Sequence, residues 1–137
     1  MSGIGFVLAF RAGGGRYAVP LERVREAARP RRITPLPGAP ASWRGVALVR
    51  GEALGVVDVA AAVGKTPSIL RGAPLVVVLR GCDHALLVDA IDGVEPFPEG
   101  RLAAPPPGCE VLSGVVADEG GSLSLLDVDL LGAGSEA

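Results

Sequence analysis

The chain has 137 residues, a length that fits one domain or two very small subdomains that share a core. Apolar residues make up 49% and charged residues 20%, which is the composition of a globular and not of a disordered protein. The formal net charge of −2 argues against a chain that is attracted as a whole to nucleic acid or to an anionic membrane.

The sequence gives no sign of export or of membrane insertion. No apolar run reaches the ~20 residues of a membrane-spanning helix, and residues 1–4 lack the basic start of a secretion signal. The two cysteines, Cys82 and Cys109, stand far apart and form no CxxC pair, which favours a reducing compartment. We therefore expect a cytoplasmic protein without direct membrane insertion.

Glycine and proline interrupt the apolar runs about every ten residues, a spacing typical of an all-β barrel or sandwich. The chain contains 20 Gly and 12 Pro. The segments predicted as strands are short, apolar and bounded by these turn residues; they are residues 4–11, 16–19, 32–34, 46–50, 54–58, 75–80, 85–89, 91–97, 111–118 and 122–127. Glycines at 13–15 and 120–121 supply two of the turns.

One segment, residues 21–28, has a helical pattern. Leu21, Val24 and Ala28 follow one another at spacings of three and four, which predicts one apolar stripe on a short helix. Pro20 is suited to the first turn of a helix, and Pro30 restricts the residue before it. Single helical turns are expected at residues 60–63 and 128–131, followed at 132–137 by a frayed end.

The residues that could carry chemistry do not form a site. The only histidine, His84, follows a turn and lacks a nucleophile at motif spacing, so we interpret it as an exposed turn residue. Residues 64–66 copy the end of a phosphate-binding loop, but Val59 stands where that motif needs glycine and Pro67 follows at once. Cysteine and aspartate lack metal-ligand spacing. We predict no catalytic residue, no metal site and no cofactor.

Several arginines crowd around the predicted helix and its exit; they are Arg23, Arg25, Arg29, Arg31 and Arg32. On a helix, Arg25 and Arg29 would share the face opposite the apolar stripe, either as a solvated face or as partners for acidic groups. Trp43 either caps a barrel end or anchors an interface. Arg25, Arg29 and Trp43 are therefore candidates for a partner interface, whereas nucleic-acid binding would call for more exposed aromatics.

The order of the motifs resembles the CheW-like chemotaxis coupling family across nearly the whole chain. The core motif of that family is Gly-Val, a short apolar gap, Arg-Gly, and an apolar strand ending in Asp, which here is residues 45–51 followed by 54–59. The other matching segments share the order and near-spacing of the family; they are residues 6–10, 17–21, 24–26, 33–37, 86–89, 91–94, 112–115 and 125–127.

The resemblance implies a mainly β fold of two small five-stranded SH3-like β-barrel subdomains with a short helix. Subdomain one would cover about residues 1–45 plus 110–137, and subdomain two about residues 46–109. We expect a shared apolar seam between the subdomains, with enough apolar surface left over at their join to receive partners.

The resemblance also implies a non-enzymatic adaptor. It would bind the cytoplasmic tip of a methyl-accepting chemoreceptor and the regulatory domain of a CheA-type histidine kinase, at membrane-associated receptor arrays. The residues on receptor-contact positions of the family are Val24, Glu26, Gly45, Val46 and Arg50. Val24 and Val46 would line an apolar groove for a receptor helix, with Glu26 and Arg50 as charged rims. Alternatively the valines are core, and Arg50 pairs with Glu52 or an Asp within the fold.

Three departures from the family pattern leave the partner open. Leu48-Val49 stands where Asn-Leu is usual, Ala85 stands where Gly is usual, and residues 60–62 are alanines in place of a charged helix. A divergent CheW-like protein of an alternative chemosensory pathway, binding receptor without kinase, therefore remains an alternative. Further alternatives are a domain of a larger protein and a nucleic-acid-binding SH3-like barrel, whose affinity would fall steeply with salt.

Overall fold

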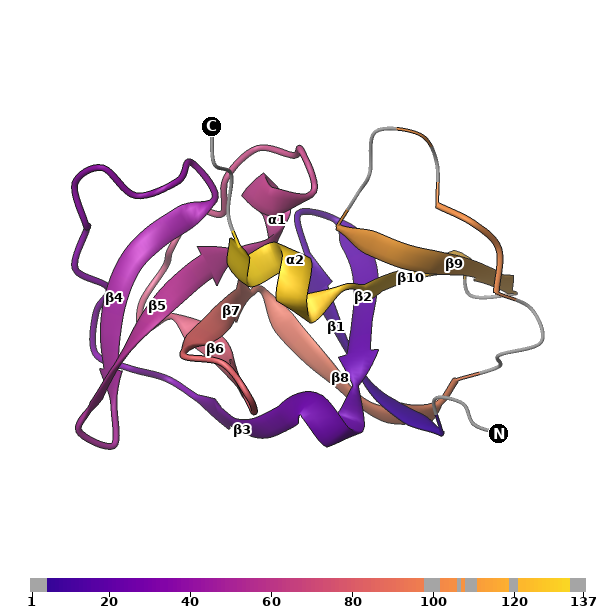
Figure 1. The fold of residues 1–137 in the computed structure, drawn as a ribbon, viewed down its shortest axis with the longest axis horizontal. Helices are drawn as coiled ribbons and strands as arrows, with labels where there is room; N and C mark the ends of the chain where they lie inside the picture. Colours follow the sequence, from indigo (N-terminus) through magenta and orange to yellow (C-terminus); the bar gives the residue numbers. More distant parts are fainter. Residues whose placement is uncertain (1–4, 98–101, 106, 108–110, 119–120, 134–137) are drawn as a thin grey trace.

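The computed structural model describes residues 5–97, 102–105, 107, 111–118 and 121–133. In this part of the chain, ten strands form two five-stranded sheets that lie side by side (Figure 1). The predicted fold class, mainly β with two five-stranded SH3-like subdomains, is confirmed.

Sheet one contains both ends of the described chain. Its strand order is β8-β1-β2-β10-β9, with β1 at Phe6–Ala12, β2 at Gly15–Pro20, β8 at Ala90–Pro96, β9 at Leu112–Asp118 and β10 at Gly121–Leu126. Neighbouring strands are antiparallel except β2 and β10, which are parallel. The side chains of one face form an interior cluster of this sheet alone: Val7, Ala9, Ala18, Phe97, Val116, Leu123 and Leu125.

Sheet two contains the middle of the chain. Its strand order is β3-β6-β7-β5-β4, with β3 at Val24–Ala28, β4 at Trp43–Val49, β5 at Glu52–Asp58, β6 at Leu75–Leu79 and β7 at His84–Val88. Only β5 and β7 pair in parallel among its described ladders. It too has an interior cluster of its own: Ala47, Val49, Leu54, Val56, Val76, Val78, Ala85 and Leu87.

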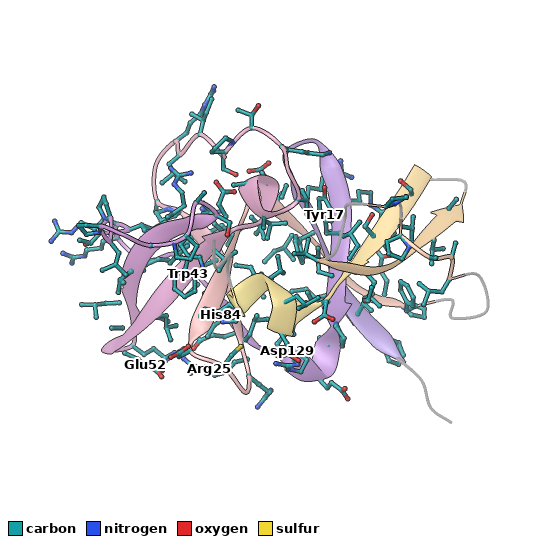
Figure 2. The ribbon with its side chains drawn as sticks, turned by 45° about the horizontal axis from the view of Figure 1, so that its top comes forward. Tyr17, Arg25, Trp43, Glu52, His84 and Asp129 are labelled. Carbon is teal, nitrogen blue, oxygen red and sulfur yellow. The ribbon has the colours of Figure 1, made fainter. Side chains whose placement is uncertain are left out.

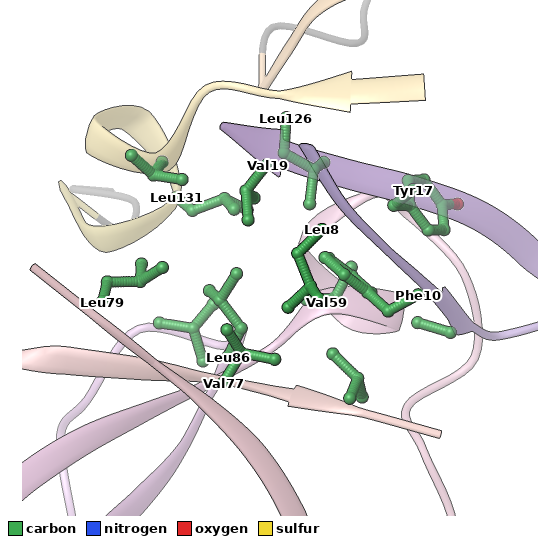
Figure 3. Close-up of a cluster of buried hydrophobic side chains, with 14 residues drawn as sticks. Leu8, Phe10, Tyr17, Val19, Val59, Val77, Leu79, Leu86, Leu126 and Leu131 are labelled. Carbon is green, nitrogen blue, oxygen red and sulfur yellow. The ribbon is translucent and has the colours of Figure 1, made fainter. Parts of the chain in front are cut away.

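The largest cluster lies between the two sheets (Figure 3). Sheet one contributes Leu8, Phe10, Ala12, Tyr17, Val19 and Leu126; sheet two contributes Val57, Val77, Leu79, Leu86 and Val88; and Val59, Val128 and Leu131 come from the short helices α1 (Val59–Ala62) and α2 (Val128–Ala133). The chain's own side chains therefore fill the seam. Among the described residues, exposed apolar side chains remain where this cluster ends, which is the kind of surface expected at the join.

The helix predicted at residues 21–28 is wrong. A single 3₁₀ turn, η1 at Leu21–Arg23, leads into β3, where Ala27 pairs with Val77 and Ala28 with Val76 of β6. Burial alternates along β3 between half-buried and exposed residues, which is the period of a strand. Three apolar residues at helical spacing favour a helix only weakly, and pairing with the apolar strand β6 makes this segment a strand instead.

The strand predicted at residues 32–34 is reduced to one bridge between Thr34 and Val46, since Pro35 has no N–H with which to continue a ladder. The number of strands still matches because β3 takes its place. The predicted subdomain boundaries differ from the sheets at two strands: β3 lies in sheet two, and β8 lies in sheet one.

A buried carboxylate at the end of β5 joins α1, the loop after α1, and β4. Asp58 is fully buried at the end of β5 and accepts hydrogen bonds from the Ala60 N–H (3.1 Å), the Ser68 N–H (2.9 Å) and the Ser68 hydroxyl (3.0 Å). Arg44 of β4 completes the set with an ion pair of 3.0 Å. Asp58 thus caps α1 and fixes the loop that follows it.

His84 is buried, which contradicts its interpretation as an exposed turn residue. It is 4% exposed because β7 pairs with β5 opposite Gly55, and its ring lies beside Trp43 with centroids 6.3 Å apart (Figure 2). Burial lowers the pKa of His84, and the negative charge of Asp83 opposes this shift only in part.

We expect Asp58→Ala to lower the free energy of unfolding by about 3–5 kcal/mol, because it removes the only carboxylate among the described residues that the structure places at Arg44 and leaves two N–H groups without partners. Urea denaturation measures the change. Asp92→Ala is the control, since Asp92 pairs with Arg11 and Arg16 at the surface and should cost about 1 kcal/mol or less. Equal losses for the two variants would contradict the role assigned to Asp58.

We expect stability to fall as the pH drops through about 6.5, because the unfolded chain binds a proton at His84 that the folded chain binds only at lower pH. One such group contributes a slope of up to about 1.4 kcal/mol per pH unit. Urea denaturation between about pH 8 and pH 5.5 should give a flatter profile for His84→Gln than for the wild type. Parallel profiles would show that the buried ring does not resist protonation.

Candidate functional site

Four charged side chains connect the edge strand β3 to the β4–β5 hairpin. Glu26 lies 2.9 Å from Nε of Arg50, and Arg25 contacts both Glu26 (3.2 Å) and Glu52 (3.0 Å). Figure 2 shows Arg25 and Glu52 next to each other at this side of the molecule. Arg50 and then Arg25 lower the pKa of Glu26, so this carboxylate is charged at neutral pH.

Arg50 stands in a turn that does not favour arginine. Val49 pairs with Glu52, so the hairpin has a two-residue loop, and φ is 53° at Arg50 and 79° at Gly51. Both loop residues are left-handed, as in a type I′ turn. For arginine this conformation costs roughly 1 kcal/mol. Its side chain is 77% exposed, so the turn presents a guanidinium to solvent beside a fixed carboxylate.

Of the five residues predicted for receptor contact, the structure joins two directly, because Glu26 binds Arg50. Val24 is two residues from Glu26 on β3, but the register shifts between them, so that Val24 pairs with Leu79 and Glu26 with Val78. Since consecutive residues of β6 point to opposite faces, Val24 and Glu26 lie on opposite faces of the sheet as well. Gly45 is buried with φ at 142°, and a Cβ there would overlap the carbonyl oxygen of Thr34, so its place is explained by the close approach of two backbones. Val46 lies beside it, in a groove with Thr34.

The three interface candidates make contacts within the chain. Arg25 and Arg29 share no helix face, because β3 is a strand; Arg25 joins the charged group described above, and Arg29 donates to the carbonyl of Ala73 at 3.0 Å. Trp43 is half-buried against the central cluster, with its ring over Gly55. Its indole N–H is buried and has no hydrogen-bond partner within the described structure.

An exposed apolar surface that the sequence analysis missed lies where the central cluster ends. Phe6 and Val94 are each 55% exposed, and Leu21 is 36% exposed. Val94 pairs with Leu8, and Phe6 pairs with Pro96 one step further along the same two strands, so Phe6 and Val94 share the face of Leu8, a member of the cluster. Phe6 and Leu21 line a hollow of about 320 Å³.

We call this surface the seam edge and define it as Phe6, Leu21, Val24 and Val94. In Figure 1 it follows the lower edge of the molecule, where β1 begins, β8 ends and η1 enters β3, with the tip of the β4–β5 hairpin further along. The alternation of Phe6, Leu8 and Phe10 was visible in the sequence. Which of them the second sheet covers was not visible, because that depends on the packing of strands far apart in the chain.

The seam edge offers apolar contact area, and the Glu26–Arg50 pair adds charge beside it. An apolar strip with a charged pair at one end fits the apolar stripe of an amphipathic helix. Within the described residues, no group of three or more His, Cys, Asp or Glu side chains is placed to hold a metal ion. Among the helices described here, none is long and apolar enough to cross a membrane.

Comparison with known proteins places the chain in a family. Residues 7–135 match the model of the CheW-like domain. Protein PilI of Pseudomonas aeruginosa is 37% identical over 99 residues, which are 71% of this chain and only 53% of PilI. Chemotaxis protein CheW of Rhizobium meliloti is 29% identical over 130 residues, 90% of this chain and 84% of that protein. Protein FrzA of Myxococcus xanthus is 33% identical over 117 residues, 81% of this chain and 73% of FrzA.

A solved structure supports the same assignment at the level of the fold. The scaffolding protein TtCheW from Thermoanaerobacter tengcongensis superposes with a TM-score of 0.77 and 20% sequence identity, covering 90% of this chain and 89% of TtCheW. Two five-stranded sheets around a common seam, and a family match over nearly the whole sequence, lead to one conclusion: the chain belongs to the CheW-like domain family.

Proposed function

We propose that this chain is a non-enzymatic adaptor that joins the cytoplasmic tip of a methyl-accepting chemoreceptor to the regulatory domain of a CheA-type histidine kinase. The family match and the relatives named for chemotaxis support an adaptor of a chemosensory pathway. The match spans about half of PilI, so the functions of that longer protein do not transfer as a whole.

The observation that carries this proposal is the seam edge. Three of its side chains remain between one third and just over one half exposed, although they continue the face of the central cluster. Large apolar groups gain roughly 1.5–3 kcal/mol each when fully buried. A receptor helix that lays its apolar stripe along β1, η1 and β8 would complete the core that the second sheet leaves unfinished.

The charged pair at the end of the seam edge would set the direction of this helix. Glu26 and Arg50 are held by each other at 2.9 Å, so both charges have fixed positions before a partner arrives. Rim charges of this kind act mainly on orientation and association rate. We therefore assign direct contact to Val24, Glu26 and Arg50, and we assign to Gly45 and Val46 the shaping of β4.

Coupling would then be a matter of geometry. The adaptor would hold the kinase at a fixed position relative to the receptor, in the cytoplasm at receptor arrays, so that a change in the receptor biases the kinase. Titrating the chain separately with a receptor cytoplasmic hairpin and with a CheA-type regulatory domain tests both halves. Binding of the receptor alone would instead support the divergent adaptor that lacks a kinase partner.

We expect Phe6→Glu to weaken binding of the receptor hairpin about tenfold or more, because it removes buried apolar area and places a charge in the contact. Isothermal titration calorimetry measures the affinity. Ile69→Glu is the matched control, since Ile69 is 74% exposed on the loop after α1, outside the seam edge. A similar loss of affinity in both variants would show that the receptor does not bind at the seam edge.

We expect Arg50→Gly to leave the free energy of unfolding within about 1 kcal/mol, because relief of the left-handed strain offsets the loss of an exposed ion pair. Receptor affinity should nevertheless fall roughly fivefold, mainly through slower association. Stopped-flow kinetics separates the two rates, and Arg11→Ala, at an exposed pair in sheet one, is the control. Unchanged affinity would exclude Arg50 from the contact.

A further inference from the structure

A second surface lies away from the seam edge, between residues 31–34 and the edge strand β4. It is a groove of about 570 Å³. Its lining combines two arginines with apolar side chains and carries no aromatic ring; the residues are Arg31, Arg32, Thr34, Val46, Ala47 and Leu48. Leu48 is 66% exposed there, which makes it one of the most exposed large apolar side chains that the structure describes.

The backbone of β4 is open at this groove. Thr34 and Val46 exchange two hydrogen bonds of 2.8 Å, N–H to carbonyl in both directions. Groups that point to the same edge of a strand recur at every second residue, so Leu48 directs its N–H and C=O to this edge as well. The segment before Thr34 forms no ladder with β4, and within the described residues Leu48 has no backbone partner on that side. The groove therefore begins where the pairing between Thr34 and Val46 ends, and it leaves the edge of β4 open at Leu48.

Its two arginines are free to bind carboxylates from outside. Arg25, Arg44 and Arg50 each lie within 4.0 Å of a carboxylate of the chain. Among the described residues, no carboxylate lies that close to Arg31 or Arg32. Both side chains belong to exposed residues, so a partner can reach them.

The chain segments that form the groove are basic. Residues 27–51 contain five arginines and no Asp or Glu. Residues 24–89, which carry sheet two, hold nine Lys and Arg against five Asp and Glu, whereas the rest of the chain holds four against ten. The overall charge of −2 is therefore the sum of a basic half and an acidic half.

We propose that this groove binds an extended acidic segment of a partner protein. The segment would add a short strand to the edge of β4 at Leu48, place apolar side chains against Val46 and Leu48, and pair its carboxylates with Arg31 and Arg32. The open backbone edge and the apolar floor favour a polypeptide. Nucleic acid would have no ring to stack on in this groove. The site is separate from the seam edge and does not depend on receptor binding.

The test uses the whole chain and a fluorescent, end-blocked peptide of alternating Glu and Val. We expect saturable binding by fluorescence anisotropy, with a shifted and protected Leu48 amide in NMR and hydrogen exchange. A peptide of alternating Gln and Val should bind about tenfold or more weakly, since it keeps the strand pairing but lacks the carboxylates. An unchanged Leu48 amide, or equal binding of the Gln peptide, would overturn the proposal.

The variant Arg31→Glu/Arg32→Glu should weaken binding of the Glu peptide at least about tenfold. Lys65→Glu/Arg71→Glu is the matched control, with the same change of charge on the loop after α1, and should lose about twofold or less. Should the first variant fail to fold, Leu48→Asp gives the same readout from one exposed position. Equal losses in both double variants would show that the peptide is attracted only by the overall charge of the chain. That result would overturn the assignment of the binding site to this groove.

Two other occupants give distinct results. The first is nucleic acid, tested with single-stranded oligothymidylate of the same charge as the peptide. If the oligonucleotide competes with the peptide, the assignment to a protein partner is overturned. Self-association of the chain, detected by analytical ultracentrifugation and abolished by Arg31→Glu/Arg32→Glu, would assign the groove to a second copy and overturn the acidic-segment proposal. A monomer that prefers the Glu peptide to the oligonucleotide supports it.

Discussion

The packing of the two sheets against each other is the constraint on which the rest of the structure depends. In β1, Val7 and Ala9 face the interior of sheet one, while Leu8 and Phe10 face the seam. In β5, the same division separates Val56 from Val57. Both of these strands thus bury residues on each of their faces, which explains their runs of consecutive apolar residues in a protein of mostly antiparallel strands. Neither sheet could bury its seam face alone, so the two subdomains form one cooperative unit.

Most strands could be predicted from the sequence because both faces are apolar and glycine or proline ends each run. The segment at residues 21–28 could not, since three apolar residues at helical spacing also fit a turn followed by an edge strand, and only the presence of β6 decides between them. His84 was misjudged for the same reason: its burial comes from β5 and Trp43, which are distant in sequence. Local patterns determine local conformation, whereas exposure depends on partners that such patterns do not identify.

The candidate site also depends on contacts between distant residues, which local patterns do not identify. The left-handed turn at Arg50 and its contact with Glu26 join residues 24 positions apart, whereas the sequence suggested Glu52 or an Asp as the partner of Arg50 within the fold. At the seam edge, Phe6 and Val94 continue the face of Leu8 on β1 and β8 but stay exposed, so the central cluster does not cover this end of the face. A surface of this origin is rigid, because the core beneath it holds it in place. Such rigidity suits an adaptor, which must hold its partners at fixed relative positions.

The arginines show how one feature of the sequence divides into two physical roles. Arg23, Arg25, Arg44 and Arg50 bind carboxylates, and each of these pairs connects separate elements: η1 to α2, β3 to the β4–β5 hairpin, β4 to the end of β5, and that hairpin back to β3. Their charge is already compensated, so a partner that uses them must compete with the fold. Arg31 and Arg32 connect nothing within the described residues and stand at an open strand edge. Binding of a partner's carboxylates in sheet two should therefore rest on the arginines that the fold does not use, whereas Arg50 would meet a receptor as part of its pair with Glu26.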